Sequence, residues 1–126
     1  MANPDDGSLR ILCIEDDPAL QKLLKLGLSC YGFEVITATH GIDAMMQYRA
    51  QEGRFDVVLS DHDLPYLNGL ELVRRFREMG YEGRIVVMSG RLSAGELYEY
   101  APYAISGFFH KPFEIGLLAT MLQRQN

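Results

Sequence analysis

The sequence has few cysteines and few basic residues, and it contains no long hydrophobic run. The 12 Lys plus Arg are outnumbered by 17 Asp plus Glu, which gives a formal charge of -5. Without a basic run, a nucleic-acid groove or an anionic membrane surface is not expected as a direct partner. No apolar stretch approaches the roughly 18–20 residues of a membrane span, and the opening MANPDDGS lacks the features of a secretory signal. We therefore expect a cytoplasmic protein.

The two cysteines and three histidines do not indicate a disulfide or a zinc site. Cys13 lies in an apolar run and Cys30 ends a helical pattern, so we expect two buried structural thiols. His40, His62 and His110 do not have the short paired spacing of zinc ligands. Zinc is therefore not expected.

The length and composition indicate a single folded domain. The chain has 126 residues, with 48% hydrophobic and 23% charged residues, and domains typically have roughly 100–200 residues. We expect a flexible N-terminal segment at residues 1–8 and one domain at residues 9–126.

Short β-branched runs alternate with longer amphipathic segments about five times along the chain. This alternation is typical of a parallel sheet with crossover helices. It predicts an α/β fold: a flavodoxin-like, doubly wound, five-stranded parallel sheet in the order 2-1-3-4-5 with five helices. The expected strands are 10–14, 33–38, 55–60, 84–88 and 107–110.

Local sequence signals place the ends of several helices. Asp17 is a suitable N-cap with Pro18 at the first helical position, and Ser93 with Glu96 forms a capping box. Pro102 is expected to end or distort the fourth helix, because proline lacks the N–H that a helix needs. The apolar faces expected to point inward are Leu20, Leu23, Leu24 and Leu28; Ile42, Met45 and Met46; Leu70, Val73 and Phe76; and Ile115, Leu118, Met121 and Leu122.

Polar residues whose side chains can bind ligands or take part in reactions follow four of the predicted strands. In a doubly wound sheet, ligands bind beyond the carboxyl ends of the strands, and these four strands are neighbours in the predicted order. The residues are Glu15, Asp16 and Asp17 after the first strand, Asp61 and Asp63 after the third, Ser89 after the fourth and Lys111 after the fifth.

Three of these carboxylates, Glu15, Asp16 and Asp61, would repel one another strongly. At roughly 5 Å, each charged pair costs about 3 kcal/mol at an effective dielectric constant near 20. Lys111, raised carboxyl pKa values or a hard divalent cation must compensate. An all-oxygen site with room for water favours Mg²⁺, with Mn²⁺ as a close substitute. Since a carboxylate can accept a phosphoryl group as an acyl phosphate, Asp61 is the candidate nucleophile.

The sequence resembles the receiver domain of the two-component response regulator family from about residue 9 to the C-terminus. The motifs that carry the resemblance are ILCIEDDP at 11–18, VVLSDHDLP at 57–65, NG at 68–69, VVMSG at 86–90 and FFHKPF at 108–113. Their order and spacing together are more specific than any one of them.

The resemblance implies a role for each matching residue. Asp61, four residues before Pro65, would be the phosphoacceptor, and it would share a metal ion with the acidic pair. The other implied roles are metal ligands for Glu15, Asp16 and the backbone carbonyl of Asp63, switch hydroxyl for Ser89, phosphate contact for Lys111 and switch aromatic for Phe108. The bond between Lys111 and Pro112 becomes a candidate cis peptide. Asp17 is left out of the metal site because it caps the first helix.

The resemblance also implies a signalling role rather than a separate enzyme. A sensor histidine kinase or a phosphotransfer protein would phosphorylate Asp61 with Mg²⁺, and a downstream effector or a covalently linked output domain would read the result. A homodimer through the face of the fourth helix, fifth strand and fifth helix is a further expectation. The alternatives are a pseudo-receiver that binds partners without phosphorylation, a flavodoxin-like electron carrier and an aspartyl phosphatase.

One segment departs from the family pattern, since bulky residues stand where receivers commonly place small ones. These residues are Tyr98, Tyr100, Pro102, Tyr103 and Ile105. They form either a partner surface or the repacked interior of a distorted helix, and the sequence leaves both interpretations open.

Overall fold

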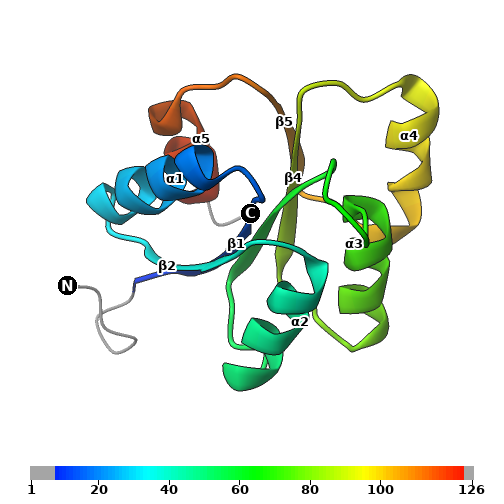
Figure 1. Cartoon of the computed structure of the whole chain (residues 1–126), viewed down its shortest axis with the longest axis horizontal. Coiled ribbons are helices and arrows are strands. Elements are labelled where there is room, and N and C mark those ends of the chain that lie inside the picture. The colour runs from blue at the N-terminus through cyan, green and yellow to red at the C-terminus, as the bar shows by residue number, and fades with distance from the viewer. Residues whose placement is uncertain (1–7, 124–126) are drawn as a thin grey trace.

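Five parallel strands form one sheet in the order β2-β1-β3-β4-β5 in the computed structural model, which describes residues 8–123 (Figure 1). This order confirms the predicted flavodoxin-like fold. The strands are β1 (Arg10–Ile14), β2 (Glu34–Ala38), β3 (Val57–Asp61), β4 (Arg84–Ser89) and β5 (Gly107–His110). The expected flexible segment at residues 1–8 lies outside the described residues except for Ser8, and the last three residues of the expected domain also lie outside them.

Five α-helices in the described part of the chain connect the strands. They are α1 (Pro18–Cys30), α2 (Gly41–Ala50), α3 (Gly69–Glu78), α4 (Ala94–Glu99) and α5 (Ile115–Gln123). None of the helices within residues 8–123 has the length and hydropathy to cross a membrane.

The helices cover both faces of the sheet (Figure 1). Helices α1 and α5 pack on one face, where their leucines meet Ile11 and Cys13 of β1. Helices α2 and α3, with the residues after α4, pack on the other face against Leu12 and Ile14. Alternate residues of one strand therefore enter two separate cores, as expected for a strand covered on both sides.

The predicted helix signals are confirmed. The Asp17 carboxylate accepts a hydrogen bond from the amide of Ala19 at 3.1 Å, and both hydrogen bonds of the Ser93 and Glu96 capping box are present. Pro102 lies in a short 3₁₀ helix that follows α4, so α4 ends after six residues.

The predicted inward face of α2 is wrong at two positions. Ile42 and Met46 are 60% and 63% exposed, whereas Gly41 and Ala44 are buried. A Cβ atom on Gly41 would lie 2.8 Å from the side chain of Leu67, so the small residues let the helix approach closely. Close packing through this face turns Ile42 and Met46 toward solvent.

Two predictions for α1 are also wrong. Leu23 is exposed although Leu24 and Leu28 are buried, and Cys30 is exposed whereas Cys13 is buried as expected. Leu24 and Leu28 are four residues apart and define the buried stripe. Cys30 is four residues after the exposed Leu26, so both lie on the outer face of the helix.

Strand boundaries differ slightly from the prediction. The third strand begins at Val57 rather than at residue 55, because the Asp56 carboxylate accepts a hydrogen bond from the amide of Arg10 at 2.7 Å just before the ladder begins. It extends to Asp61, and β4 extends to Ser89. The candidate site residues Asp61 and Ser89 are therefore the last residues of their strands, and the sheet holds their backbone in place.

Candidate functional site

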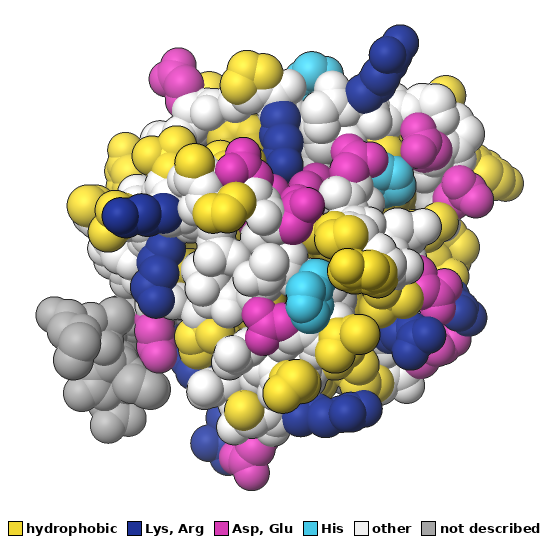
Figure 2. Space-filling model, viewed as in Figure 1, with side chains coloured by type: hydrophobic (Ala, Val, Ile, Leu, Met, Phe, Trp, Pro, Cys, Tyr) yellow, Lys and Arg dark blue, Asp and Glu magenta, His cyan; other side chains and the backbone are white. Residues whose placement is uncertain are grey.

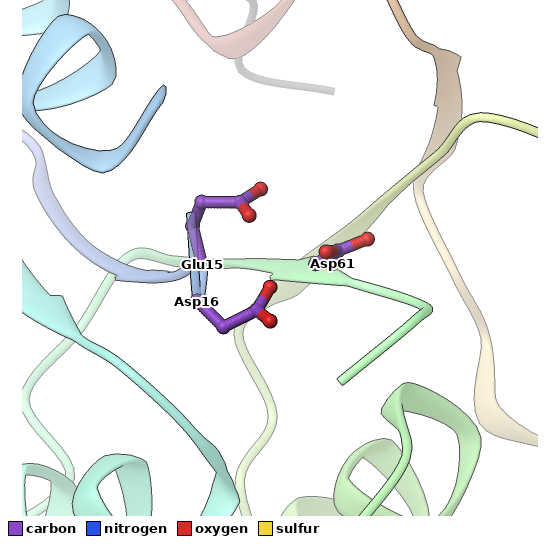
Figure 3. A group of neighbouring side chains, drawn as sticks. All are labelled: Glu15, Asp16 and Asp61. Carbon is purple, nitrogen blue, oxygen red and sulfur yellow. The ribbon is translucent and has the colours of Figure 1, made fainter. Parts of the chain in front are cut away.

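The carboxyl ends of β1 and β3 bring three acidic side chains together (Figure 3). Ile14 of β1 is in register with Ser60 of β3, so Glu15 and Asp16 leave the sheet beside Asp61. One carboxylate oxygen from each of these three residues lies within 4.8 Å of the other two. Figure 2 shows acidic side chains gathered across the upper middle of the same face of the molecule.

The three carboxylates differ in their exposure to water. Glu15 and Asp61 are 1% and 3% exposed, whereas Asp16 is exposed. Burial raises the pKa of Glu15 and of Asp61, although Lys111 opposes the increase at both. At these separations each ionised pair costs about 3 kcal/mol at an effective dielectric constant near 20. The site therefore favours an added positive charge.

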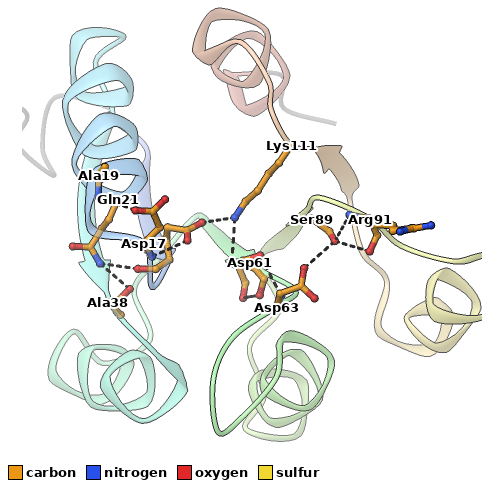
Figure 4. Close-up of polar contacts among 11 residues, drawn as sticks. Asp17, Ala19, Gln21, Ala38, Asp61, Asp63, Ser89, Arg91 and Lys111 are labelled. Atoms are coloured by element: carbon orange, nitrogen blue, oxygen red, sulfur yellow. Dashed lines mark hydrogen bonds and ion pairs between the residues drawn. The ribbon is translucent and has the colours of Figure 1, made fainter.

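Lys111 contacts both buried carboxylates (Figure 4). Its Nζ lies 2.7 Å from Oε1 of Glu15 and 3.2 Å from Oδ2 of Asp61. Burial alone would lower the pKa of Lys111, but the hydrogen bond to Glu15 and the charges of Asp61 and Glu15 outweigh it and raise the pKa. A single cation thus offsets part of the charge of the acidic cluster.

The loop after β3 fixes the orientation of the Asp61 carboxylate. The amide of Asp63 donates a hydrogen bond to Oδ1 of Asp61 at 3.2 Å. Gly69 closes the loop by donating its amide hydrogen bond to the carbonyl of His62 at 2.9 Å. One oxygen of Asp61 thus faces the loop backbone while the other faces Lys111.

Ser89 is buried at the end of β4, close to the acidic cluster but bonded elsewhere (Figure 4). Its hydroxyl donates toward the carbonyl of Arg91 at 3.0 Å and toward Oδ2 of Asp63 at 3.4 Å, and it accepts from the Arg91 amide. Among the described residues, Ser89 makes no hydrogen bond with Asp61. The structure therefore brings the Ser89 hydroxyl near Asp61 without joining them.

The loop after β1 separates the roles of the three consecutive acidic residues. Asp17 caps α1, and its amide donates to Oε2 of Glu15 at 3.0 Å. Asp17 is not part of the group of three close carboxylates. Gln21, a residue without any recognisable site motif, donates to the carbonyls of Glu15 and Ala38 and holds this loop against β2.

Phe108 lies on β5 and is 40% exposed. It lines a cavity of about 160 Å³ together with Ser89, Leu92 and Leu97. Its ring meets the edge of Tyr100 with 5.5 Å between centroids. The candidate cis peptide between Lys111 and Pro112 is confirmed.

The bulky residues from Tyr98 to Ile105, which span the end of α4 and the residues after it, do not all fit one of the two interpretations. Tyr100 is 1% exposed, so the interpretation of this residue as part of a partner surface is wrong. Tyr103 and Ile105 pack against the same core, whereas Tyr98 is exposed. Tyr100 also contacts His62, a buried residue next to Asp61.

The fold and the acidic carboxyl edge together define a CheY-like signalling receiver. Receivers of this class are signalling modules rather than conventional enzymes, and they bind Mg²⁺ in an acidic pocket. The chain belongs to the response regulator receiver domain family, whose sequence profile matches residues 11–123.

Individual relatives agree with this assignment. The chain is 29% identical to two-component response regulator 24 of Arabidopsis thaliana, over 100% of the chain and 90% of the relative. It is 30% identical to the transcriptional regulatory protein PrrA of Mycobacterium tuberculosis over 92% of the chain, but it spans about half (49%) of that relative. A solved structure of the Vibrio cholerae chemotaxis protein CheY4 aligns with a TM-score of 0.86 at 28% identity and covers 94% of the chain and 98% of its own.

Proposed function

We propose that the domain, residues 9–126, receives a phosphoryl group on Asp61 from a histidine kinase or a phosphotransfer protein. The observation that carries the proposal is the buried Asp61 carboxylate, which lies beside Glu15 and Asp16 and in contact with Lys111. Response regulator receivers as a family interact with kinases, phosphotransfer proteins and output domains.

In the proposed transfer, an oxygen of Asp61 attacks the phosphorus of a phosphohistidine. The new bond joins this oxygen to phosphorus, and the bond between phosphorus and the imidazole nitrogen breaks, with its electron pair returning to the nitrogen. The Asp63 amide holds the carboxylate in one orientation, and Lys111 is in place to neutralise the phosphoryl oxygens. Positioning and charge neutralisation are the main requirements of this chemistry.

The donor set fits a divalent cation that prefers oxygen ligands. Glu15, Asp16, Asp61 and the backbone carbonyl of Asp63 would hold Mg²⁺, with Mn²⁺ as a substitute. When bound, the ion would neutralise the carboxylates and the phosphoryl oxygens. Two buried carboxylates with raised pKa values, contacted within residues 8–123 by a single lysine, support this part of the proposal.

Phosphorylation would then shift the domain between two states. Ser89 would exchange its bonds to Arg91 and Asp63 for a bond to the phosphoryl group, and Phe108 would turn into the cavity of about 160 Å³ that both residues line. A switch from 1:99 to 99:1 needs about 5.5 kcal/mol of differential binding. A few hydrogen bonds to charged groups, at roughly 1.5–3 kcal/mol each, are sufficient.

The output partner would read the surface of α4, β5 and α5, either as a downstream effector or as a linked output domain. The same face is proposed to form a homodimer. Exposed apolar side chains on it support the proposal; they are Leu97, Phe108 and Leu117.

The test is phosphorylation by acetyl phosphate with Mg²⁺, followed by detection of the labelled protein. Wild-type protein is expected to become labelled, and Asp61→Asn is expected to remain unlabelled. Asp63→Asn is the matched control, because it makes the same chemical change two residues away and keeps the carbonyl. Undiminished labelling of Asp61→Asn contradicts the proposal, and a folded wild-type protein without any label identifies a pseudo-receiver.

A further inference from the structure

His62 follows Asp61 directly and is buried, with 8% of its surface exposed. Its Nδ1 lies 2.6 Å from the hydroxyl of Tyr100, and its Nε2 lies 3.1 Å from Oε2 of Glu96. Glu96 belongs to α4, and Tyr100 is the residue that ends it. One side chain therefore joins the end of β3 to two points on α4.

The direction of these hydrogen bonds follows from the chemistry of the partners. The Ser93 amide and His62 lower the pKa of Glu96, so its carboxylate is ionised and can only accept. His62 Nε2 must then carry the donated proton, and in the neutral ring Nδ1 is an acceptor. Burial raises the pKa of Tyr100, so its hydroxyl keeps the proton that it donates to Nδ1. All three polar groups are thus satisfied.

Tyr100 also connects this network to the proposed switch aromatic. Its ring is almost fully buried, with a centroid 5.6 Å from that of His62 and 5.5 Å from that of Phe108. Movement of Phe108 or of α4 therefore changes the surroundings of a ring that is hydrogen-bonded to the neighbour of Asp61.

Helix α4 itself has few other anchors. It is only six residues long, and none of its residues from Ala94 to Glu99 is buried. Isolated helices this short are unstable in water, so tertiary contacts decide where the helix lies. The bonds from His62 to Glu96 and Tyr100 are therefore a large part of what holds α4 in place.

We propose that His62, Tyr100 and Glu96 form a latch that holds α4 and Phe108 in the unphosphorylated arrangement. The latch rests on the proposed function of Asp61, because phosphorylation would have to open it. Part of the energy gained at the phosphoryl site is then used to break the hydrogen bond between His62 and Tyr100. A variant with a weakened latch spends less of that energy on opening, so it binds a phosphoryl mimic more tightly than wild type does.

The test compares Tyr100→Phe with Tyr98→Phe in the full chain. Both changes remove one hydroxyl, but Tyr98 is exposed and, in the described part of the chain, makes no hydrogen bond through its side chain. The affinity for beryllofluoride with Mg²⁺, a mimic of the phosphoryl group, is measured by calorimetry. Tyr100→Phe is expected to bind about 2- to 10-fold more tightly than wild type, the change that corresponds to a net hydrogen-bond contribution of about 0.5–1.5 kcal/mol. Tyr98→Phe is expected to match wild type.

A second variant keeps the test independent of any folding defect in Tyr100→Phe. Glu96→Gln retains a residue suited to the capping box but removes the ionised acceptor that faces His62. It is expected to tighten beryllofluoride binding as well. Amide exchange of α4 in the ligand-free protein should be faster in both latch variants than in Tyr98→Phe.

The outcomes separate the latch from the function on which it rests. If wild type binds beryllofluoride and both latch variants bind like Tyr98→Phe or more weakly, the latch is wrong and the function of Asp61 stands. If wild-type protein binds no beryllofluoride with Mg²⁺, the proposed function fails, and the coupling of the latch to phosphorylation fails with it.

Discussion

At the scale of single residues, the site combines two buried carboxylates with one lysine that contacts both. Glu15 and Asp61 reach Lys111 from adjacent strands, and Asp16 adds a third, exposed carboxylate. The arrangement leaves the cluster with excess negative charge, and two of its three carboxylates are buried. That imbalance is the physical basis for expecting a divalent cation here.

The assignment of the metal ligands is tested by two neighbouring substitutions. Asp16→Asn removes a carboxylate from the cluster and is expected to weaken Mg²⁺ binding by about tenfold or more. Asp17→Asn makes the same change one residue later, where asparagine still caps α1, and is expected to have a much smaller effect. Calorimetric titration with Mg²⁺ measures both. A larger loss in Asp17→Asn would reverse the assignment.

The role of Lys111 as a counter-charge leads to two opposite effects of Lys111→Met. Without divalent cations, Glu15 and Asp61 lose their partner, and the free energy of unfolding is expected to fall by about 1–3 kcal/mol, less than for a fully buried pair. The affinity for Mg²⁺ is expected to rise several-fold, because a nearby positive charge is gone. Denaturation and metal titration measure these effects.

Lys22→Met is the control for that experiment, since Lys22 is exposed on α1. It is expected to leave both quantities close to those of wild type. Weaker Mg²⁺ binding in Lys111→Met would contradict the assigned role of Lys111.

The site residues at the ends of strands could be predicted from the sequence, because their position depends on the order of the strands. Contacts between side chains that are made by tertiary packing could not. Glu15 and Lys111 follow strands and Asp61 ends one, and strand order brings strand ends together. The bond between His62 and Tyr100 joins residues 38 positions apart through the packing of α4. Nothing in the spacing of these two residues points to that contact.

At the scale of structural elements, the helix caps and the sheet order were predictable because each depends on local signals or on alternation. The buried face of α2 could not be predicted in this way. Its burial is decided by the close approach at Gly41, which turns Ile42 and Met46 outward despite their apolar character. Tertiary contact overrides hydrophobic periodicity in this helix.

The junction between β3 and α3 makes Gly69 essential to the site. A Cβ atom at this position would lie 2.6 Å from the carbonyl oxygen of Asp61 and 2.7 Å from Cα of His62, both backbone atoms. Gly69→Ala is therefore expected to lower the free energy of unfolding by about 1–3 kcal/mol and to slow phosphorylation by acetyl phosphate. Chemical denaturation and labelling rates measure the two effects.

Gly95→Ala is the matched control, because the new Cβ would make only an ordinary van der Waals contact, 3.8 Å from Oγ of Ser93. Alanine inside α4 is expected to stabilise the protein by about 0.5–1 kcal/mol. Equal stability of Gly69→Ala and wild type would contradict the close approach at β3 and α3.

At the scale of the whole molecule, the net charge of -5 is less informative than where the acidic residues lie. Three carboxylates meet at one edge of the sheet, and the burial of Glu15 and Asp61 together with the mutual repulsion of all three acts against folding until a cation binds. The chain spans nearly all of one curated relative but about half of another.

The cost of burying ionised carboxylates makes the free energy of unfolding depend on pH. Burial raises the pKa values of Asp61 and Glu15 above their ordinary values of 3.8 and 4.5, so the folded state binds their protons more tightly than the unfolded state. Their contribution to stability is full below those ordinary values and is lost as pH rises through the raised pKa values. Without divalent cations, Asp61→Asn is therefore expected to be more stable than wild type near neutral pH.

The difference in free energy of unfolding between Asp61→Asn and wild type reports on Asp61 alone. Carboxylates whose pKa values are lowered, such as Glu71, contribute equally to both proteins and cancel. The difference is expected to shrink as pH falls and also when Mg²⁺ is added near neutral pH. Denaturation of both proteins across pH, with and without Mg²⁺, measures it. A difference that stays constant across pH would contradict the buried, uncompensated state of Asp61.

The central claim, that Asp61 carries the phosphoryl group, is tested most directly by chemical trapping. Wild-type protein is treated with acetyl phosphate and Mg²⁺, and borohydride then reduces the aspartyl phosphate to homoserine, which peptide mass spectrometry locates in the chain. The account predicts homoserine at position 61 and at no other acidic residue of the site. Homoserine at Asp16 or Asp63, or its absence from a folded protein treated in this way, would contradict the account.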